Sequence, residues 1–179
     1  MQKKKSSKEL LRESAIELFS KYPVDKVSVN MICENCAVSQ RTFYNHFRDK
    51  NDLIAWVYTE ILDEVELLKG DSRTLHDYIC ALVQGICDYS DFYVSVVRYT
   101  GQNDFRRSIY QPLRECVCKL ITSKYNDEIT EEMLNAIDIY LFGCIGYMEH
   151  LLLTNNILPA ETMIPLFETQ MPLILTKYL

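Results

Sequence analysis

Two serine-capped segments separated by a very short connection are the feature that most constrains the fold. Ser28 can cap a short helix that turns Ile32 inward, and Ser39 can cap another that stacks Phe43 and Phe47 one turn apart. The connection between them, NCAVS, has room only for a tight turn. Two short helices on so tight a turn form a helix-turn-helix, whose second helix can enter a DNA major groove about 12 Å wide.

The rest of the chain predicts further helices and no strand of useful length. Ser6 and Thr74 each stand three residues before an acidic residue, which is capping-box spacing, and Thr130 precedes two glutamates. We therefore expect an all-α fold of about nine helices. The predicted helices outside the two short ones cover about residues 6–22, 49–68, 74–89, 92–99, 104–124, 130–155 and 160–178, with proline bends at Pro112 and Pro172.

Charge is distributed unevenly along the chain. Residues 1–50 hold ten Lys and Arg against six Asp and Glu, whereas residues 51–179 hold nine against nineteen. The net charge of −6 is therefore +4 in the first part and −10 in the rest. A basic N-terminal part on an acidic body suggests nucleic-acid contact at one end, although a merely solvated basic surface would look the same.

Several classes of protein are not expected. No run of about 18 uncharged apolar residues occurs, so we expect no membrane span. Seven cysteines without a secretion signal indicate reduced thiols and a cytoplasmic protein. Only five glycines are present and no phosphate-loop motif occurs. Cys33 and Cys36 form a lone CxxC, and no nucleophile–base set appears, so we expect no enzyme, metal or cofactor.

The second helix of the motif carries polar side chains beside its apolar stripe. Arginine pairs bidentately with guanine edges, and glutamine or asparagine with adenine edges. Side chains at helix starts, such as Ser28 and Lys50, can meet a phosphate together with backbone N–H groups. The polar residues that lie off the apolar stripe are Gln40, Arg41, Thr42, Asn45 and His46.

Residues 8–55 resemble the N-terminal domain of the TetR/AcrR family of transcriptional regulators. The residues that carry this resemblance are Phe19, Val27-Ser28-Val29, Ile32-Cys33, Cys36-Ala37-Val38-Ser39, Thr42-Phe43-Tyr44, His46-Phe47, Lys50 and Asp52-Leu53. The C-terminal part resembles the subgroup related to dihydroxyacetone-kinase regulators, through YLFGCIGYMEHLL.

The resemblance implies a three-helix DNA-binding domain over residues 1–50 and a helical ligand-sensing and dimerisation domain over residues 51–179. It places DNA-facing side chains on the recognition helix and phosphate contacts at the helix starts, and it implies that Tyr44 contacts the DNA backbone. The DNA-binding residues expected on these grounds are Ser28, Ser39, Gln40, Arg41, Thr42, Tyr44, Asn45, His46 and Lys50.

Two positions depart from the family pattern. The family usually has glycine at the turn position held here by Ala37, and alanine at the position held by Cys33. Alanine in a left-handed conformation costs on the order of 1 kcal/mol, so we expect a strained or reshaped turn before the recognition helix.

The C-terminal part is rich in side chains suited to a sensing pocket. Tyrosine offers an apolar ring with a hydroxyl tip, although tyrosines are also common in cores and interfaces. The tyrosines expected as pocket candidates are Tyr78, Tyr89, Tyr93, Tyr99, Tyr110, Tyr140 and Tyr147.

The eighth predicted helix is the candidate dimer seam. It carries one apolar stripe together with two glycines that would let another backbone approach closely, although the glycines could instead relieve crowding within one subunit. With residues from the ninth helix, the expected interface comprises Leu141, Gly143, Ile145, Gly146, Met148, Leu152, Leu166, Phe167, Ile174 and Leu175.

These features predict a homodimeric regulator that binds double-stranded DNA at a palindromic operator, acts as a repressor and is released by a small-molecule effector. The alternative is a helical regulatory module that acts mainly through a protein co-regulator, with weak or lost DNA binding. Salt-dependent binding to palindromic DNA separates the two.

Overall fold

Helices form all the regular structure in the described part of the chain, and no strand occurs there. The computed structural model describes residues 5–67, 74–99 and 105–179. Nine α-helices of seven or more residues lie in these ranges, which confirms the all-α prediction; the predicted end of the fourth helix lies outside them. The helices are α1 (Ser7–Lys21), α2 (Val29–Asn35), α3 (Gln40–His46), α4 (Lys50–Leu67), α5 (Leu75–Asp88), α6 (Ser90–Val97), α7 (Phe105–Lys119), α8 (Glu131–Thr154) and α9 (Ala160–Thr169).

Side-chain caps determine where five of these helices begin. The hydroxyl of Ser6 accepts from the backbone N–H of Glu9 at 3.2 Å while the Glu9 carboxylate accepts from the backbone N–H of Ser6, so the predicted capping box is present. A second capping box joins Thr74 and Asp77. The remaining hydroxyl caps are those of Ser28 on α2, Ser39 on α3 and Thr130 on α8, all as predicted.

The prolines affect the last helices in two ways. Helix α7 continues through Pro112 and passes into a π-helical segment, Leu120–Lys124. The helix predicted over 160–178 with a bend at Pro172 is instead two elements: α9 ends at Thr169, and a 3₁₀ helix, Leu173–Tyr178, follows Pro172. Proline lacks the N–H that a continuing helix would need, so the chain restarts there.

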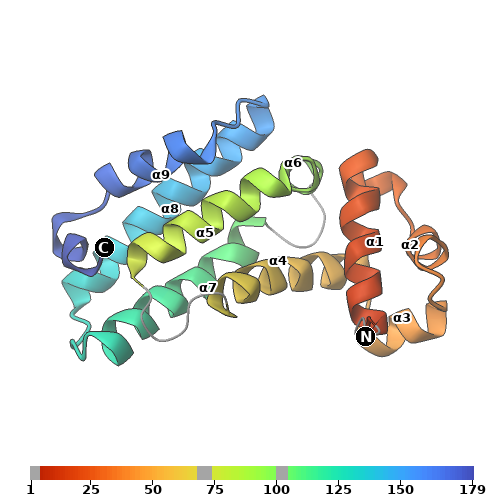
Figure 1. The fold of residues 1–179 in the computed structure, drawn as a ribbon, viewed down its shortest axis with the longest axis horizontal. Helices are drawn as coiled ribbons and strands as arrows, with labels where there is room; N and C mark the ends of the chain where they lie inside the picture. The colour runs from red at the N-terminus through yellow and green to blue at the C-terminus, as the bar shows by residue number, and fades with distance from the viewer. Residues whose placement is uncertain (1–4, 68–73, 100–104) are drawn as a thin grey trace.

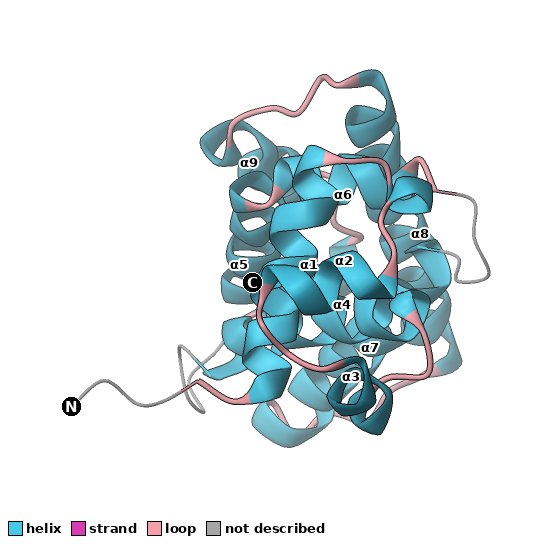
Figure 2. Ribbon diagram, turned by 90° about the vertical axis from the view of Figure 1, so that its right-hand side faces the viewer, coloured by secondary structure: helices cyan, strands magenta, loops and turns pink. Residues whose placement is uncertain are grey.

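The molecule consists of a small helical bundle at one end and a larger helical body at the other (Figure 1). The bundle is formed by α1, α2 and α3, and α4 leads from it into the body formed by α5, α6, α7, α8 and α9. The view onto the end of the molecule has α3 in front, with α1 and α2 beside it (Figure 2). Helix α3 therefore lies at the extremity of the molecule, remote from α8 and α9.

Helix α1 is packed against α6, so the bundle and the body share one hydrophobic core. The ring of Phe19 on α1 lies 6.3 Å from that of Phe92 on α6, and both side chains are fully buried. The hydroxyl of Ser95 donates to the carbonyl of Tyr22 at 3.1 Å. These contacts hold the bundle to the body in addition to the chain connection through α4.

Helix α8 is long and apolar on most of its surface. By length and composition alone it could cross a membrane, and it is the one helix among the described residues that could. The core helix of a soluble protein meets the same criteria, and α8 has ion pairs to α7 through Asp138 with Arg114, at 2.7 Å, and Glu149 with Arg106. The absence of a membrane span therefore stays a prediction.

Candidate nucleic-acid interface

The turn before α3 has the geometry of a Schellman motif with alanine at its left-handed position. Ala37 has φ of 53°, in the region that favours glycine. Its N–H donates to the carbonyl of Glu34 at 3.3 Å, and the N–H of Val38 donates to the carbonyl of Cys33 at 3.0 Å. The turn thus keeps its hydrogen bonds, and Ala37 bears the left-handed strain that the sequence predicted.

Two phenylalanines hold α3 on the bundle. Phe43 is fully buried and Phe47 is 4% exposed, with their rings 5.7 Å apart. The Phe47 ring lies 5.3 Å from that of Trp56 on α4, and the ammonium of Lys8 lies 4.1 Å from the centre of the Trp56 ring. Because one stripe of α3 is buried in this way, its other side chains face outward.

The outward side chains of α3 include residue types that recognise base edges. Arg41, Tyr44 and Asn45 are exposed, Tyr44 to 56%. The amide of Gln40 donates to the side-chain oxygen of Asn30 on α2 at 2.7 Å. This hydrogen bond orients the Gln40 side chain across the two helices, while Arg41 and Asn45 stand at the surface.

Other predicted contact residues also hold the motif together. The hydroxyl of Ser39 accepts from the N–H of Thr42 at 3.1 Å, and the two hydroxyls are 2.9 Å apart. His46 shares a hydrogen bond of 2.9 Å with the hydroxyl of Ser7 on α1. Ser28 accepts from the N–H of Met31 at 3.2 Å. Each of these side chains lies at the end of a short helix, so it sets the pose of α3 as well as facing solvent.

Lys50 points inward rather than toward solvent. Its ammonium donates to the carbonyls of Val24 at 2.6 Å and Val27 at 3.1 Å, and lies 5.4 Å from the centre of the Tyr99 ring. Burial lowers the pKa of this ammonium. A phosphate contact by Lys50 would require the ammonium to leave these carbonyls, so that role stays a prediction.

The CxxC pair behaves as core packing. Cys33 is 3% exposed, and burial raises the pKa of its thiol. The Cys36 thiol donates to the carbonyl of Ile32 at 3.2 Å. Among the described residues, no group of three or more His, Cys, Asp or Glu side chains is placed to hold a metal ion.

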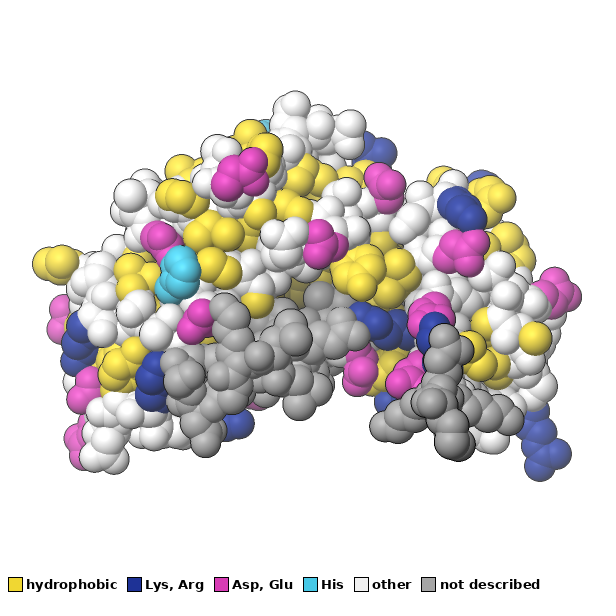
Figure 3. All heavy atoms as spheres, in the orientation of Figure 1, with side chains coloured by type: hydrophobic (Ala, Val, Ile, Leu, Met, Phe, Trp, Pro, Cys, Tyr) yellow, Lys and Arg dark blue, Asp and Glu magenta, His cyan; other side chains and the backbone are white. Residues whose placement is uncertain are grey.

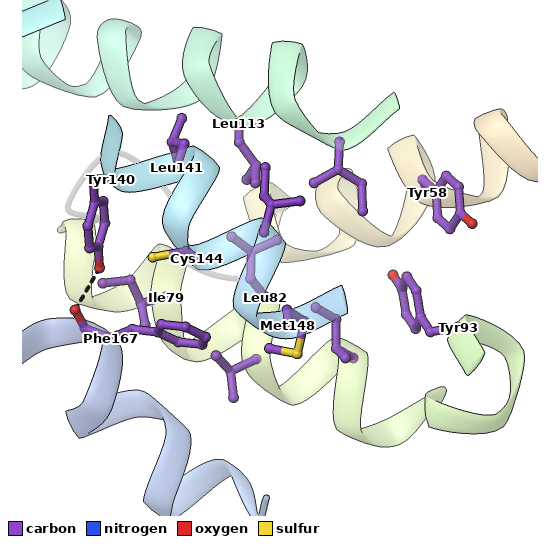
Figure 4. A pocket seen from close by; sticks show the side chains of 14 residues that line it. Tyr58, Ile79, Leu82, Tyr93, Leu113, Tyr140, Leu141, Cys144, Met148 and Phe167 are labelled. Atoms are coloured by element: carbon purple, nitrogen blue, oxygen red, sulfur yellow. Dashed lines mark hydrogen bonds between the residues drawn. The ribbon is translucent and has the colours of Figure 1, made fainter. Parts of the chain in front are cut away.

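The tyrosine prediction needs correction. Side chains from α4 to α9 surround a cavity of about 100 Å³ (Figure 4), and Tyr93 and Tyr140 line it. Tyr78 lines a second cavity of about 40 Å³. The other four candidates, Tyr89, Tyr99, Tyr110 and Tyr147, line neither cavity. Tyr147 is 41% exposed, and Tyr110 stacks on the exposed Phe142 with ring centres 4.4 Å apart.

Most of the side chains that line the cavity are aliphatic, and they were not predicted from the sequence. Tyr58 on α4 was missed as well, because nothing in the local sequence distinguishes it from the other tyrosines. The sequence pattern that could have predicted the aliphatic lining is the apolar period of α5. Ile79, Leu82, Val83 and Ile86 recur there at helical spacing, and all face the cavity.

The apolar stripe predicted as the dimer seam is also corrected. Leu141, Ile145, Met148 and Leu152 are at most 7% exposed within a single subunit, so they face its core. Phe167 and Leu175 are likewise buried, whereas Leu166 and Ile174 are half-buried.

The opposite face of α8 is the exposed apolar one. Ile139 is 73% exposed, Phe142 57%, and Tyr147 and Leu153 more than 40%. A Cβ built on Gly143 or Gly146 would meet nothing within 4 Å. The two predicted glycines therefore lie beside open space, next to this apolar stripe. Hydrophobic side chains are also spread over the face seen in Figure 3, on the part formed by α5, α8 and α9.

Comparison with known proteins agrees with this architecture. The family model for bacterial regulatory proteins of the tetR family matches residues 11–57, and a model for a transcriptional regulator C-terminal region matches residues 73–171. An HTH-type transcriptional regulator of Staphylococcus aureus (strain USA300) is 34% identical over 59 residues, which are 33% of this chain and 32% of that protein. The matched segment thus spans about a third of the length of such curated relatives.

Two solved structures share the whole fold. The dihydroxyacetone kinase operon activator DhaS has a TM-score of 0.76 at 13% identity, covering 96% of this chain and 97% of that chain. A TetR transcriptional regulator from Rhodococcus sp. RHA1 has a TM-score of 0.66 at 16% identity, covering 93% and 97%. Proteins of this kind are transcription regulators and not enzymes, as predicted. From its N-terminal helix-turn-helix to its C-terminal helical part, the chain belongs to the TetR family of transcriptional regulators.

Proposed function

We propose that the chain is a cytoplasmic repressor that binds a palindromic operator as a homodimer and is released by a small-molecule effector. The observation that carries this proposal is the two-sided α3: Phe43 and Phe47 are buried, while Arg41, Tyr44 and Asn45 stand exposed at the end of the molecule. A helix held in this way can enter a major groove with its polar side leading.

Specific recognition would come from the exposed side chains of α3. Arg41 is suited to a guanine edge, and Asn45 or Gln40 to an adenine edge. By analogy with the family, Thr42 and His46 would also face the DNA, Tyr44 would contact its backbone, and Ser28 and Lys50 would meet phosphates. Ser39, which caps α3, would also contact the DNA.

A homodimer would supply the second half of the recognition. One recognition helix contacts only a few base pairs, and a two-fold axis doubles the site and makes it palindromic. We place the seam on the exposed stripe of α8, where Ile139, Phe142 and Leu153 flank Gly143 and Gly146. Burying this stripe removes apolar surface from water, which also accounts for the apolar character of α8 without a membrane.

DNA binding and effector sensing are assigned to different parts of the chain. We propose residues 1–50 as the DNA-binding domain and residues 51–179 as the sensing and dimerisation domain, with the cavity of the larger body as the effector site.

Selection of bound sequences from a random duplex pool tests this function. We expect enrichment of one palindromic sequence, with binding that weakens as salt concentration rises. The Arg41→Ala variant is the matched probe, because Arg41 is exposed and its loss leaves the buried stripe intact. If no duplex is enriched and affinity does not depend on salt, the chain acts through a protein partner instead.

A further inference from the structure

The cavity in the larger body has an almost wholly hydrocarbon wall. It has a volume of about 100 Å³ and receives side chains from α4, α5, α6, α7, α8 and α9. Leucine, isoleucine, valine, phenylalanine and methionine make up most of the lining, and no charged side chain occurs among the described residues around it. An ion entering this cavity would lose its hydration without meeting a countercharge.

The polar groups of the lining are few: three tyrosine hydroxyls and the thiol of Cys144. The hydroxyl of Tyr140 donates to the carbonyl of Phe167 at 2.8 Å (Figure 4). Burial raises the pKa of the Cys144 thiol to about 11, so this sulfur stays protonated near neutral pH and is a poor nucleophile. A ligand here is therefore held without a covalent bond to Cys144.

The remaining polar groups are at the end of the cavity opposite Tyr140. Tyr58 and Tyr93 face each other there (Figure 4), with ring centres 5.7 Å apart and planes inclined by 16°. Burial raises the pKa of both phenols, so they are neutral at physiological pH. This end offers two aromatic rings and neutral hydroxyls, which suit an aromatic ligand with at most one polar substituent.

The size of the cavity indicates the size of the ligand. An engineered protein cavity of about 150 Å³ with a similar Leu, Ile and Phe lining stays dry and binds benzene or xenon. The cavity described above is about two thirds as large and also mainly apolar. A single six-membered ring is therefore the size of molecule that this cavity suits, and a small substituent on it would lie toward the open side of the cavity.

We infer that this cavity binds a small uncharged apolar molecule, of the size of one substituted aromatic ring, and excludes carboxylates and polyols. The inference names the chemical class of the effector and rests on the proposed function only where DNA release is concerned. Binding itself is a property of the cavity and is measured without DNA.

The tyrosine end of the cavity lies next to the helix-turn-helix bundle. The ring of Tyr58 is 5.9 Å from that of Phe92, which in turn lies 6.3 Å from Phe19 on α1. The guanidinium of Arg12 on α1 also acts electrostatically on the Tyr93 hydroxyl. A ligand against Tyr58 and Tyr93 is thus one aromatic layer from α1, where it can favour one pose of the bundle over another.

Isothermal titration calorimetry on the full chain tests the inference with four probes: toluene, phenol, benzoate and glycerol. Toluene and benzoate have similar size and differ in charge, and phenol adds one hydroxyl to the ring. We expect saturable 1:1 binding of toluene and phenol per subunit, and at least tenfold weaker binding of benzoate and glycerol at pH 7.

Two cavity-filling variants and a matched control locate the site. Cys144→Leu and Ile86→Phe each extend a lining side chain into the cavity, whereas Cys118→Leu makes the same change at a half-buried cysteine outside its lining. With helical spectra retained, the first two should lose at least tenfold in toluene affinity and the control should bind as the original does.

Operator binding is measured in a separate experiment. If no DNA duplex is bound specifically, the proposed function is overturned, but the result for ligand binding in the cavity still holds. The inference itself is overturned if toluene and phenol show no saturable binding, if benzoate binds as tightly as toluene, or if both folded cavity-filling variants bind toluene unchanged.

Discussion

Replacing Ala37 by glycine should stabilise the protein. Ala37 has φ of 53°, and a left-handed conformation costs a residue with a Cβ about 1–2 kcal/mol. Glycine removes that cost, but it makes the unfolded chain more flexible, which offsets about 0.4–1 kcal/mol. The balance is a gain of about 0.5–1 kcal/mol in the free energy of unfolding for Ala37→Gly, or a rise of roughly 1–4 °C in Tm for a chain of this size.

Urea unfolding followed by circular dichroism, at one fixed protein concentration, measures this gain. The two turn hydrogen bonds made by the N–H groups of Ala37 and Val38 remain available to glycine, so the slope of the transition should not change. Ala81→Gly, in the middle of α5, is the matched control. It should lower the free energy of unfolding by about 0.5–1 kcal/mol, because glycine weakens a helix interior. If Ala37→Gly destabilises the protein as much as Ala81→Gly does, the turn carries no left-handed strain and the reasoning fails.

Three further substitutions test the interface and the seam. Arg41→Ala should relax base preference at one position per half-site at a cost of about 1–3 kcal/mol, and equal affinity of both proteins across a sequence library would refute base recognition by Arg41. Lys50→Ala should lower the free energy of unfolding, measured in urea, by about 1–3 kcal/mol, because two backbone carbonyls lose their donor. It should reduce the salt slope of DNA binding by about one unit only if the ammonium also reaches a phosphate. Gly146→Leu meets open space within its own subunit, so it should give helical monomers in sedimentation at micromolar concentration; a dimer that persists would place the seam elsewhere, and Gln84→Leu on the exposed side of α5 should leave the dimer intact.

Helix starts were predictable because capping is local chemistry. A hydroxyl at the first non-helical position bonds to an N–H two or three residues later, and nothing distant is needed to form that bond. The serines and threonines chosen from sequence as caps of α1, α2, α3, α5 and α8 all make this bond. The helix-turn-helix followed from two of them, Ser28 and Ser39, together with the short connection.

The inward face of α8 could not be predicted in the same way. Leu141 and Ile145 lie on one side of this helix and Ile139 and Phe142 on the other, so apolar residues occur on both and periodicity does not tell which side is buried. Which side is buried depends on the helices that pack against α8 in the folded chain, α7 and α6 among them, and the sequence of α8 alone does not contain that information. The glycines were the useful local signal, since Gly143 lies beside open space on the exposed side.

The tyrosines show a second limit of sequence reasoning. Tyrosine occurs in cores, in interfaces and at surfaces, so the residue type alone does not predict whether the side chain is buried. Tyr93 and Tyr178 are buried, whereas Tyr44 and Tyr147 are exposed. Only the packing of the other helices separates these cases.

The contact between α1 and α6 has a consequence for how the protein is made. Phe92 follows Phe19 by 73 residues in the chain, so the α6 side chain that packs on the buried Phe19 is made well after the helix-turn-helix bundle. At a translation rate of about 5–20 residues per second, the ribosome needs about 4–15 s to add that interval. During that time the nascent N-terminal helices display an apolar surface that chaperones or other nascent chains can bind. The same surface would be uncovered in any fragment that ends after the recognition helix. The isolated DNA-binding part is therefore expected to aggregate more readily than the whole chain.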